Sequence, residues 1–478
     1  MRFLAVFLLA ISPLFAQQLT VRSATVTHID LAWTGSPGEW QVERRAGSGQ
    51  FEKIAASSSG SYNDEKIGAY ATYQYRVRTQ AGMVSNEVTV GPPPSGVNIP
   101  AKLPAKVEPE KYGAQVAIAN DENGDPALAF IWEDVNGDRD NSDSTVYFVH
   151  WNRATYSWKS PVRVAVAGDI PTQNVDPVAL TCDRATGVFA LPFPVAGAKG
   201  VQVALSRDGG NTWQATSIAG DLEGAISSTA LTTANGRFLL ALSSDEGGIR
   251  SYSGLVGTSP TEWKAQSAPM PNQGKFVANA NVALAADPAG KPLVAYWVQP
   301  EDGQNYRILL WKPESGEVAS AADSNNVVPD GPNLRLVASG NKIHLLFNSL
   351  RENNDFDHGV WYTASSGAAW SAPVKLPIDG PRSTNSPFAL TVDSKGRIAA
   401  VFDANSGTGD TACGYPVISL SADGTKWTSC GPGKRTGGAF DPQSSSIGAL
   451  YGPDDRINVV WHQAGDNKYG TGVLLWRE

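Results

Sequence analysis

The chain reads Ser206-Arg207-Asp208-Gly209-Gly210-Asn211-Thr212-Trp213 near its middle. Residues 201–205 alternate like a strand before it, and residues 214–218 can form the next strand. The short carboxylate of Asp208 can accept hydrogen bonds from N–H groups of the same turn, and the two glycines after it tolerate positive φ. Trp213 can fold back as an apolar plug. The stretch therefore predicts a hairpin turn in which Asp208 is structural, not catalytic.

A shortened copy, Ser421-Ala422-Asp423-Gly424-Thr425-Lys426-Trp427, occurs near the C-terminus. The chain also repeats a pair of apolar runs around a central turn residue, at a period of about 50 residues, which is typical of the four-stranded blades of a β-propeller. The central residues of these turns are Gly124, Gly187, Gly236, Gly290, Gly340, Gly396 and Asp455. The second pair of predicted strands, for example, is residues 178–180 and 189–191 around Gly187. The pattern predicts an all-β propeller of seven repeated units.

Both turns resemble the Asp box, the S-x-D-x-G-x-T-W motif of sialidase-like β-propellers, which is also known as the BNR repeat. The residues that match it are Ser206, Asp208, Gly210 and Trp213, and then Ser421, Asp423, Gly424 and Trp427. The resemblance implies that these residues are structural and that a ligand site lies on the opposite face of the propeller. Six blades remain the alternative to seven, because sialidases have six.

Residues 17–91 form a second predicted domain, with short apolar strands separated by turns, as in a β-sandwich. This part resembles a fibronectin type III module. Trp33 matches the core tryptophan of its second strand, residues 72–77 match the sixth strand, and residues 85–90 match the last. The resemblance implies a spacer or adhesive unit, to which we assign no chemistry.

Residues 1–16 have the pattern of a secretory signal peptide, with Arg2 before an apolar run at residues 3–15. The run is too short for a membrane-spanning helix, and no other span is predicted. We expect cleavage after Ala16 and a secreted or periplasmic protein. A proline-rich linker, residues 92–102, leads to the propeller at residues 103–478, and residues 103–107 are expected to supply the missing outer strand of the seventh unit.

The charge balance limits the possible partners. The chain has 38 Lys and Arg against 46 Asp and Glu, for a formal net charge of −8. Nucleic acid is excluded as a partner, because phosphate binding needs a basic face and no cluster of Lys and Arg supplies one. No motif requires a cofactor, and the protein is expected to be a monomer.

The face opposite the Asp boxes is predicted to collect the longer polar loops, among them residues 133–144 and 348–359, where binding residues usually lie. Sialidases hold a substrate carboxylate with three arginines, and bidentate guanidinium contacts suit this task. The candidate substrate-binding residues on this face are Arg139, Arg351, Arg382, Arg435 and His358.

Catalytic candidates on the same face are weaker. Paired carboxylates could serve glycoside hydrolysis, or they could be ordinary solvated loop residues. The candidates are Glu352, Asp355 and Asp357, with Tyr306 as a positional candidate for a sialidase nucleophile. The Phe/Tyr-Arg-Ile-Pro motif of sialidases is absent, and its nearest match, Tyr306-Arg307-Ile308-Leu309, is predicted to lie inside a strand.

Residues 134–140 place oxygen ligands at alternate positions, as in the first half of a calcium-binding loop. The candidate ligands are Asp134, Asn136, Asp138 and Asp140. The loop lacks the closing bidentate glutamate, so a solvated acidic loop is the other interpretation.

Two of the three cysteines are expected to form a disulfide. Cys413 is placed at the start of the third strand of the sixth unit and Cys430 at the end of the fourth, so the two lie near one another across the second Asp-box hairpin. Cys182 is expected to stay reduced and buried.

Three functions are compatible with the sequence. The first is a secreted protein that recognises carbohydrate or cell-surface glycans, the second is an active sialidase-like glycoside hydrolase, and the third is a structural or adhesive envelope protein. The sugar is not specified by any residue.

Overall fold

A computed structural model of the chain divides into two compact units, formed mainly by Met1–Pro94 and by Ser95–Trp151 with Trp158–Arg477. We describe each unit by itself. The residues that the structure describes are 17–24, 29–35, 38–46, 49–66, 73–90, 116–135, 142–152, 157–164, 178–195, 200–219, 222, 224–246, 248–269, 274–278, 280–301, 306–323, 333–351, 357–367, 369–376, 388–402, 417–430, 447–452, 455, 457–463 and 472–477.

Unit 1 is built from two antiparallel sheets. The first contains β1 (Leu19–Ala24), β2 (Ile29–Trp33) and β5 (Ser61–Asp64) in the order β1-β2-β5. The second has the order β4-β3-β6-β7, from β3 (Trp40–Ala46), β4 (Glu52–Ser57), β6 (Tyr73–Thr79) and β7 (Val88–Val90). The alternating pattern of β6 buries Tyr73, Tyr75 and Val77 and leaves the residues between them partly exposed, as a half-buried strand requires.

The core of unit 1 contains the tryptophan that the sequence placed there. Trp33 is buried, and its ring lies 6.4 Å from that of Trp40 on β3. A buried carboxylate network in this unit joins Asp64 to the Tyr75 hydroxyl and to Arg44, both at 2.8 Å. Each polar group of this network has a partner, so its burial does not leave an unsatisfied charge.

Unit 2 contains seven sheets among the described residues, each a meander of antiparallel strands. Sheet 1 holds β8 (Val116–Asn120), β9 (Pro126–Val135), β10 (Ser142–Asn152), β11 (Ser157–Trp158) and β12 (Val162–Arg163); sheet 2 holds β13 (Thr181–Asp183), β14 (Val188–Pro194), β15 (Gly200–Ser206) and β16 (Gln214–Ala219); sheet 3 holds β17 (Ile226–Ala234), β18 (Arg237–Ser244), β19 (Ile249–Leu255) and β20 (Lys264–Ser267). Sheet 4 holds β21 (Lys275–Phe276), β22 (Ala283–Ala286), β23 (Pro292–Gln299), β24 (Arg307–Lys312) and β25 (Glu317–Asp323); sheet 5 holds β26 (Leu334–Ser339), β27 (Lys342–Arg351), β28 (Asp357–Ser365) and β29 (Val374–Lys375); sheet 6 holds β30 (Phe388–Val392), β31 (Ile398–Phe402), β32 (Val417–Ser421) and β33 (Thr428–Cys430); sheet 7 holds β34 (Ile447–Tyr451), β35 (Ile457–Gln463) and β36 (Gly472–Arg477).

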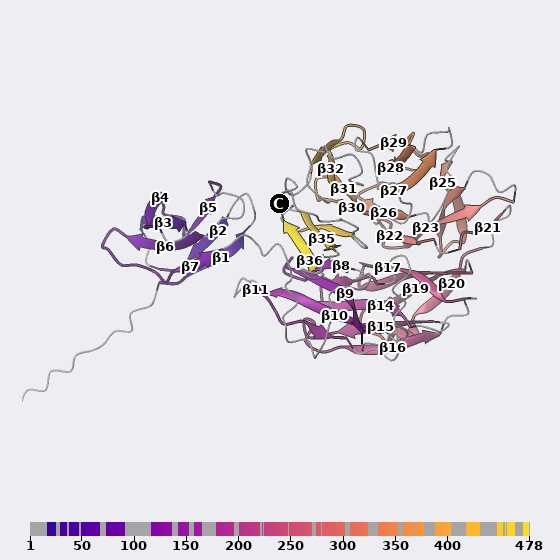
Figure 1. Cartoon of the computed structure of the whole chain (residues 1–478), viewed down its shortest axis with the longest axis horizontal. Helices are drawn as coiled ribbons and strands as arrows, with labels where there is room; N and C mark the ends of the chain where they lie inside the picture. The colour runs from indigo at the N-terminus through magenta and orange to yellow at the C-terminus, as the bar shows by residue number, and fades with distance from the viewer. Residues whose placement is uncertain are drawn as a thin grey trace, which may run out of the picture. The chain divides into compact units, whose positions relative to one another are not determined.

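The sheets of unit 2 are arranged around a common centre (Figure 1). The inner strands β8, β13, β17, β22, β26, β30 and β34 each contact the next one in this order, and β34 contacts β8. This cycle of contacts is the arrangement of a β-propeller, and it confirms the prediction of an all-β fold. In the part of the chain that the structure describes, a 3-10 turn at Pro260–Glu262 is the one helical element, and no helix could cross a membrane.

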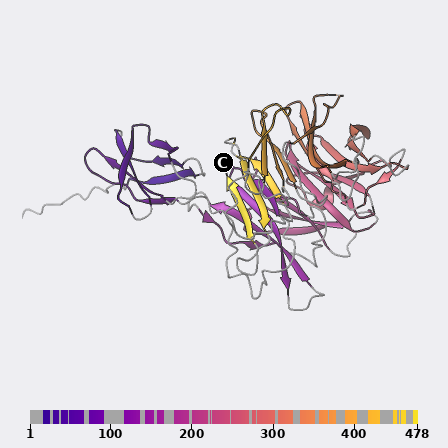
Figure 2. The same cartoon turned by 45° about the horizontal axis from the view of Figure 1, so that its top comes forward.

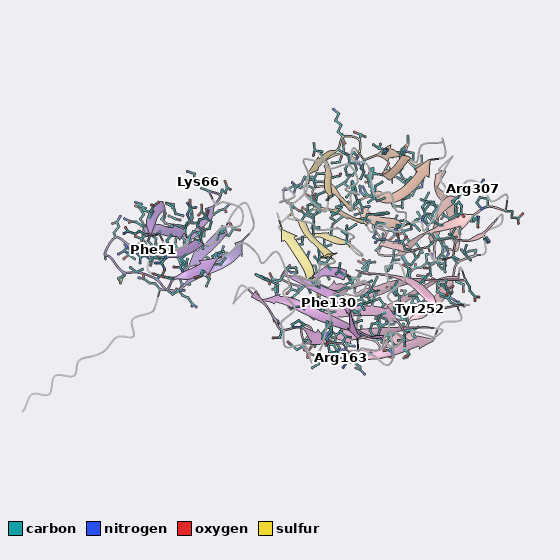
Figure 3. The ribbon with its side chains drawn as sticks, viewed as in Figure 1. Phe51, Lys66, Phe130, Arg163, Tyr252 and Arg307 are labelled. Carbon is teal, nitrogen blue, oxygen red and sulfur yellow. The ribbon has the colours of Figure 1, made fainter. Side chains whose placement is uncertain are left out.

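The two ends of the cycle meet between sheet 7 and sheet 1. Asn120 donates its side-chain N–H to the Tyr451 carbonyl at 2.9 Å, and Val460 of β35 joins the apolar cluster formed by Phe130 and other residues of sheet 1. Phe130 is among the side chains labelled in Figure 3. Residues 103–107, which the sequence predicts as the outer strand of sheet 7, lie outside the described residues.

The core of the propeller lies between neighbouring sheets. One cluster joins sheets 1 and 2, another joins sheets 2 and 3, and similar clusters fill the gaps between the later sheets. Their largest fully buried members include Phe148, Phe189, Trp297 and Phe347. Truncating such a residue to alanine costs about 3–5 kcal/mol, because the lost transfer energy adds to that of the cavity.

The meander gives the propeller two faces. Because consecutive strands are antiparallel, the first and third turns of each sheet lie at one edge, and the second loop and the connection to the next sheet lie at the other. We call these the Asp-box face, after the two turns that resemble this motif, and the loop face. Figure 2 shows the long β9–β10 hairpin, coloured purple, projecting from its sheet.

Several predicted boundaries were wrong, because strands near the loop face extend further than their composition suggests. The sequence predicted a loop over residues 348–359, but β27 continues to Arg351 and β28 begins at Asp357. Likewise the loop predicted over residues 133–144 is shortened by β9 and β10. In contrast, the strand predicted at residues 178–180 begins only at Thr181, although Val178 and Leu180 are buried.

Candidate functional site

The first of the two turns that resemble an Asp box joins β15 and β16, and its polar side chains are used within the turn. Asp208 accepts from the Thr212 N–H at 2.9 Å, from the Thr212 hydroxyl at 2.6 Å and from the Ser206 hydroxyl at 2.8 Å. The Ser206 oxygen in turn accepts from the Gly210 N–H at 2.9 Å. Gly209 and Gly210 have φ of 69° and 86°, which is the left-handed region that the sequence predicted.

Trp213 and Gly210 attach this turn to the neighbouring sheet. The Trp213 indole donates to the Gly210 carbonyl at 3.1 Å, and its ring meets Phe148 of β10 edge-on at 4.9 Å. A Cβ on Gly210 would lie 1.9 Å from a ring carbon of Phe148. The turn of sheet 2 is therefore packed directly on sheet 1, which is a structural role.

The second Asp box repeats this construction between β32 and β33. Asp423 accepts from the N–H groups of Thr425 and Lys426 at 2.8 and 3.0 Å, and the Trp427 indole donates to the Gly424 carbonyl at 3.1 Å. Trp427 meets Tyr362 of β28 edge-on at 5.1 Å, so sheet 6 is joined to sheet 5.

The two carboxylates have the electrostatics of hydrogen-bond acceptors. Hydrogen bonds from the Thr212 hydroxyl and N–H lower the pKa of Asp208 to about 2. Backbone hydrogen bonds from Lys426 and Thr425 lower the pKa of Asp423 well below its ordinary range. Neither group can act as a general acid near neutral pH, which agrees with the structural role expected for both.

The structure also reveals tryptophans at the corresponding turn of two other sheets. Trp263 follows the turn between β19 and β20 and packs between sheets 2 and 3. Trp370 pairs with Ser365 beyond β28 and packs against the cluster of sheets 4 and 5. The Ser365 hydroxyl accepts from the Gly367 N–H at 3.3 Å, much as Ser206 serves Gly210. This equivalence is hard to predict from the sequence because these turns lack the aspartate, and the usable signal is a tryptophan after a serine-containing turn.

Two buried histidines lie close to the aromatic partners of the Asp-box tryptophans, one on the same strand as its partner and one on the neighbouring strand. His150 of β10 places Nε2 3.1 Å from a carboxylate oxygen of Asp121, and its Nδ1 has no hydrogen-bond partner. Nδ1 of His344 on β27 shares a 2.7 Å hydrogen bond with the Tyr362 hydroxyl. Burial, with a smaller contribution from Lys342, lowers the pKa of His344 to about 4, so its ring is neutral at pH 7.

The candidates on the loop face are only partly described. The register of β27 and β28 pairs Arg351 with Asp357 and Leu350 with His358. The structure thus brings three predicted site residues to the end of one hairpin, in strands and not in a loop as predicted. Several candidates lie outside the described residues: Arg139, Arg382, Arg435, Glu352, Asp355 and the candidate calcium ligands Asn136, Asp138 and Asp140. Asp134 pairs with Asp143 in the β9–β10 ladder.

Tyr306 is the one catalytic candidate whose side chain is described. It lies directly before β24 and packs against the cluster between sheets 4 and 5. Burial raises the pKa of its hydroxyl. A nucleophilic phenol needs the opposite shift, because the deprotonated oxygen is the reactive form. Arg307, which follows it, is exposed and is labelled in Figure 3.

The described residues include only part of the predicted metal site and one cysteine of the predicted disulfide. No group of three or more His, Cys, Asp or Glu side chains suited to a metal occurs among the residues whose placement is given. Cys182 is buried in β13 and unpaired, as expected. Cys430 ends β33 opposite Ile418, and Cys413 lies outside the described residues.

Comparisons with known proteins give structural similarities alone. No protein family model matches the chain, and no curated protein matches it. A hydrazine synthase of Kuenenia stuttgartiensis is similar with 14% identity and a TM-score of 0.47, over 80% of this chain and 99% of that one. A GH93 alpha-L-arabinofuranosidase of Fusarium graminearum has 14% identity and a TM-score of 0.43, over 64% and 94%. An intramolecular trans-sialidase from Ruminococcus gnavus has 10% identity and a TM-score of 0.43, over 80% and 98%.

Proposed function

We propose that this protein recognises carbohydrate through the loop face of its propeller and does not hydrolyse it. The observation that carries the proposal is the pair of Asp boxes, whose hydrogen bonds repeat one construction in two sheets. This motif is the resemblance to sialidase-like propellers, and a glycan ligand follows from that resemblance. The aspartates themselves are committed to their turns, so the ligand site belongs on the other face.

The hairpin of β27 and β28 supports a binding site on the loop face. Its register aligns Arg351 with Asp357 at the end of two strands that run back into the propeller core. Residues held on strands are positioned more exactly than residues on loops. We propose Arg351 and His358 as binding residues, together with Arg139, Arg382 and Arg435, which the sequence predicts on the same face.

Tyr306 favours binding over catalysis. Its hydroxyl has a raised pKa because of burial, and the ring packs into the core between two sheets. Neither property suits the nucleophile of a sialidase-like hydrolase. The sequence also lacks the Phe/Tyr-Arg-Ile-Pro motif, so hydrolysis is the alternative that the experiment below has to exclude.

Finer features of the proposal concern architecture and location. We propose a seven-bladed propeller, closed by an outer strand from residues 103–107, and a fibronectin type III-like unit 1 with the strand order reported above. We propose that the signal peptide is cleaved and that the protein acts outside the cytoplasm as a monomer.

The test is a glycan array followed by a hydrolysis assay on every glycan that binds. We expect binding without turnover, and Arg351→Ala is expected to weaken binding about tenfold or more, the loss typical of a charge-assisted contact. Arg184→Ala is the matched control, because Arg184 is an exposed arginine in the β13–β14 turn of the Asp-box face. If a bound glycan is hydrolysed, the proposal of binding without hydrolysis is wrong. Equal losses in the two variants would contradict the loop-face site.

A calcium site at residues 134–140 is a separate proposal. Binding of Ca²⁺ to the native state alone raises stability by mass action, so chelation should lower the melting temperature. Asp138→Ala should remove this dependence on calcium, whereas Asp287→Ala, on the Asp-box face, should keep it. A melting curve that does not respond to chelator would exclude the site.

A further inference from the structure

The sheet β4-β3-β6-β7 of unit 1 has one face in the core and one face turned away from it. Val42 of β3 and Tyr75 and Val77 of β6 belong to the core cluster. Because successive side chains of a strand alternate, the residues between them lie on the other face. We call it the arginine face, and its members on β3 and β6 are Gln41, Glu43, Arg45, Gln74, Arg76 and Arg78.

Two guanidinium groups of the arginine face are held over one aromatic ring. The guanidinium carbons of Arg45 and Arg76 lie 4.6 and 4.0 Å from the ring centroid of Phe51, which is labelled in Figure 3. Arg45 also donates from Nε to the Gln74 side-chain oxygen at 2.6 Å. Arg76 donates from Nε to the Glu43 carboxylate at 2.6 Å. Since a guanidinium has five N–H donors, these contacts position both groups and leave donors for a further partner.

The further partner within the chain is Glu87, and its contacts are long. One carboxylate oxygen of Glu87 is 3.4 Å from Nη2 of Arg45, and the other is 3.6 Å from Nη1 of Arg76. Charge-assisted N–H···O bonds are usually about 2.7–2.9 Å long, so Glu87 bridges the two guanidinium groups without a close bond to either. Its side chain is 45% exposed, against 11% for Glu43. Glu87 is therefore a loosely held carboxylate at a point where two guanidinium groups converge.

We propose that Arg45 and Arg76 bind a carboxylate of an acidic polysaccharide, which displaces Glu87. Guanidinium groups suit this task because their N–H donors match the two oxygens of a carboxylate. Exposed ion pairs contribute little to stability, so the contact with Glu87 is readily given up. The site lies wholly within unit 1 and does not depend on the loop face of unit 2.

Charge favours an anionic ligand at this face, although the whole chain has a formal net charge of −8. The three arginines of the arginine face outnumber the two glutamates that contact them, Glu43 and Glu87. Displacing Glu87 from the two guanidinium groups leaves Glu43 as the glutamate paired with these arginines. A carboxylate on the ligand then restores the balance of charge.

The composition of the arginine face favours a sugar polymer over a protein partner. Its members on β3 and β6 are amides, guanidiniums and a carboxylate, and none of them is aliphatic. A protein interface usually depends on aromatic or aliphatic anchors, and Phe51 is half-buried and already in contact with two guanidinium groups. The amides of Gln41 and Gln74 can hydrogen-bond to sugar hydroxyls. A polymer of uronic acid supplies both hydroxyls and carboxylates.

The experiment measures binding of the whole chain to polygalacturonate by isothermal titration calorimetry. The methyl ester of the same polymer keeps the sugar chain and removes its charge, and poly-glutamate presents carboxylates on a peptide. Arg45→Gln is compared with Arg22→Gln, which removes an exposed arginine from β1 in the other sheet. Glu87→Gln is compared with Glu65→Gln, which removes an exposed glutamate directly after β5. Melting temperatures check that all four variants remain folded.

We expect the unsubstituted chain to bind polygalacturonate and not its methyl ester. Arg45→Gln should bind about tenfold more weakly, the loss typical of a charge-assisted contact, whereas Arg22→Gln should bind like the unsubstituted chain. Glu87→Gln should bind about threefold more tightly because the internal competitor is removed, and Glu65→Gln should not. A gain in affinity cannot result from partial unfolding.

The proposal is overturned if polygalacturonate does not bind, or if its methyl ester binds equally well. It is also overturned if Arg45→Gln and Arg22→Gln lose binding equally, or if Glu87→Gln binds no more tightly than Glu65→Gln. Tighter binding of poly-glutamate than of polygalacturonate would mean that the partner is an acidic protein segment. Arg351→Ala should leave the response to Glu87→Gln unchanged, because Arg351 belongs to unit 2, and a lost response would move the site away from Arg45 and Arg76.

Discussion

The two Asp-box turns have the same backbone construction and different partners in the neighbouring sheet. Trp213 of the first turn packs on Phe148, beside which His150 is paired with Asp121. Trp427 of the second packs on Tyr362, whose hydroxyl is hydrogen-bonded to His344. The position that receives the tryptophan is aromatic in both, but a phenyl ring in one and a hydrogen-bonded phenol in the other.

The comparison separates what a turn needs from what a sheet interface needs. The hydrogen bonds of Ser, Asp and Gly are local, so the motif alone is sufficient to form them. The partner ring must only fill the space above the glycine, because a Cβ on Gly210 or Gly424 would lie 1.9 or 2.6 Å from that ring. The buried histidine of each site has a different hydrogen-bond partner, a carboxylate for Nε2 of His150 and a phenol for Nδ1 of His344. Four predictions test this account.

The largest effect is expected from Gly210→Ala. The new methyl group would overlap Phe148 in addition to straining a φ of 86°, so we expect a loss of about 4 kcal/mol of unfolding free energy. Gly209→Ala is the control, because Gly209 has a similar φ of 69° and no heavy atom within 4 Å of the added Cβ. Chemical denaturation of both variants measures the difference. Equal losses would show that backbone strain, and not packing on sheet 1, makes the glycine necessary.

A smaller effect is expected from a disulfide that would distinguish the second hairpin from the first. Cys430 lies in β33, and we predict that it pairs with Cys413, which adds about 3 kcal/mol by the chain-entropy estimate for a short loop. Reducing agent should lower the melting temperature of the natural chain and leave that of Cys430→Ser unchanged. Cys182→Ala should keep the response to reducing agent. Free thiols at both positions in a non-reduced digest would refute the bridge.

The third effect is a pH dependence of stability that comes from His344, beside the second Asp-box turn. The pKa of His344 is about 4 in the folded protein and ordinarily 6.5, so below pH 6.5 the unfolded chain binds a proton that the folded chain does not. Stability is therefore full above pH 6.5 and is lost as the pH falls toward 4, by about 2 kcal/mol between pH 6.5 and 5.

His344→Gln should remove this part of the pH dependence, as measured by denaturation at several pH values. Asp121, beside the first Asp-box turn, should give a different pH dependence. Burial raises the pKa of the Asp121 carboxyl. Its hydrogen bonds with His150 and with backbone N–H groups lower the pKa by more than burial raises it, so the net pKa lies below 3.8. The stability that the Asp121 carboxylate contributes is therefore lost only as the pH falls below that value. A pH profile that is unchanged by His344→Gln would contradict the assignment.

The smallest effect is expected from Asp208→Ala. Asp208 is exposed and organises the turn by accepting hydrogen bonds, so its removal should cost about 1 kcal/mol. Asp208→Asn keeps the acceptor oxygen and should recover most of the loss. A strong effect of Asp208→Asn on glycan binding, with stability preserved, would give the Asp box a functional role that its geometry does not suggest.

The site was less predictable from the sequence than the fold. The turn residues Asp208, Gly210 and Asp423 could be assigned because their partners lie within four residues of them. The position of Arg351 and Asp357 could not, since β27 and β28 continue into a segment whose polar composition resembles a loop. Strand pairing there is sustained by a long hairpin that begins in the core. Trp263 and Trp370 were overlooked for a related reason: their role is defined by the sheet they pack against.

The sequence by itself determined the all-β class, the hairpin turns at residues 206–213 and 421–427, and the buried place of Trp33 in unit 1. Each depends on interactions between near neighbours or on a period that repeats along the chain. Only the tertiary structure decided which aromatic ring covers each glycine, how β34 meets β8, and that Met83 lies against Gln17. These contacts join residues separated by about 60 to more than 300 positions, so they follow from the packing of whole sheets, which no local pattern records.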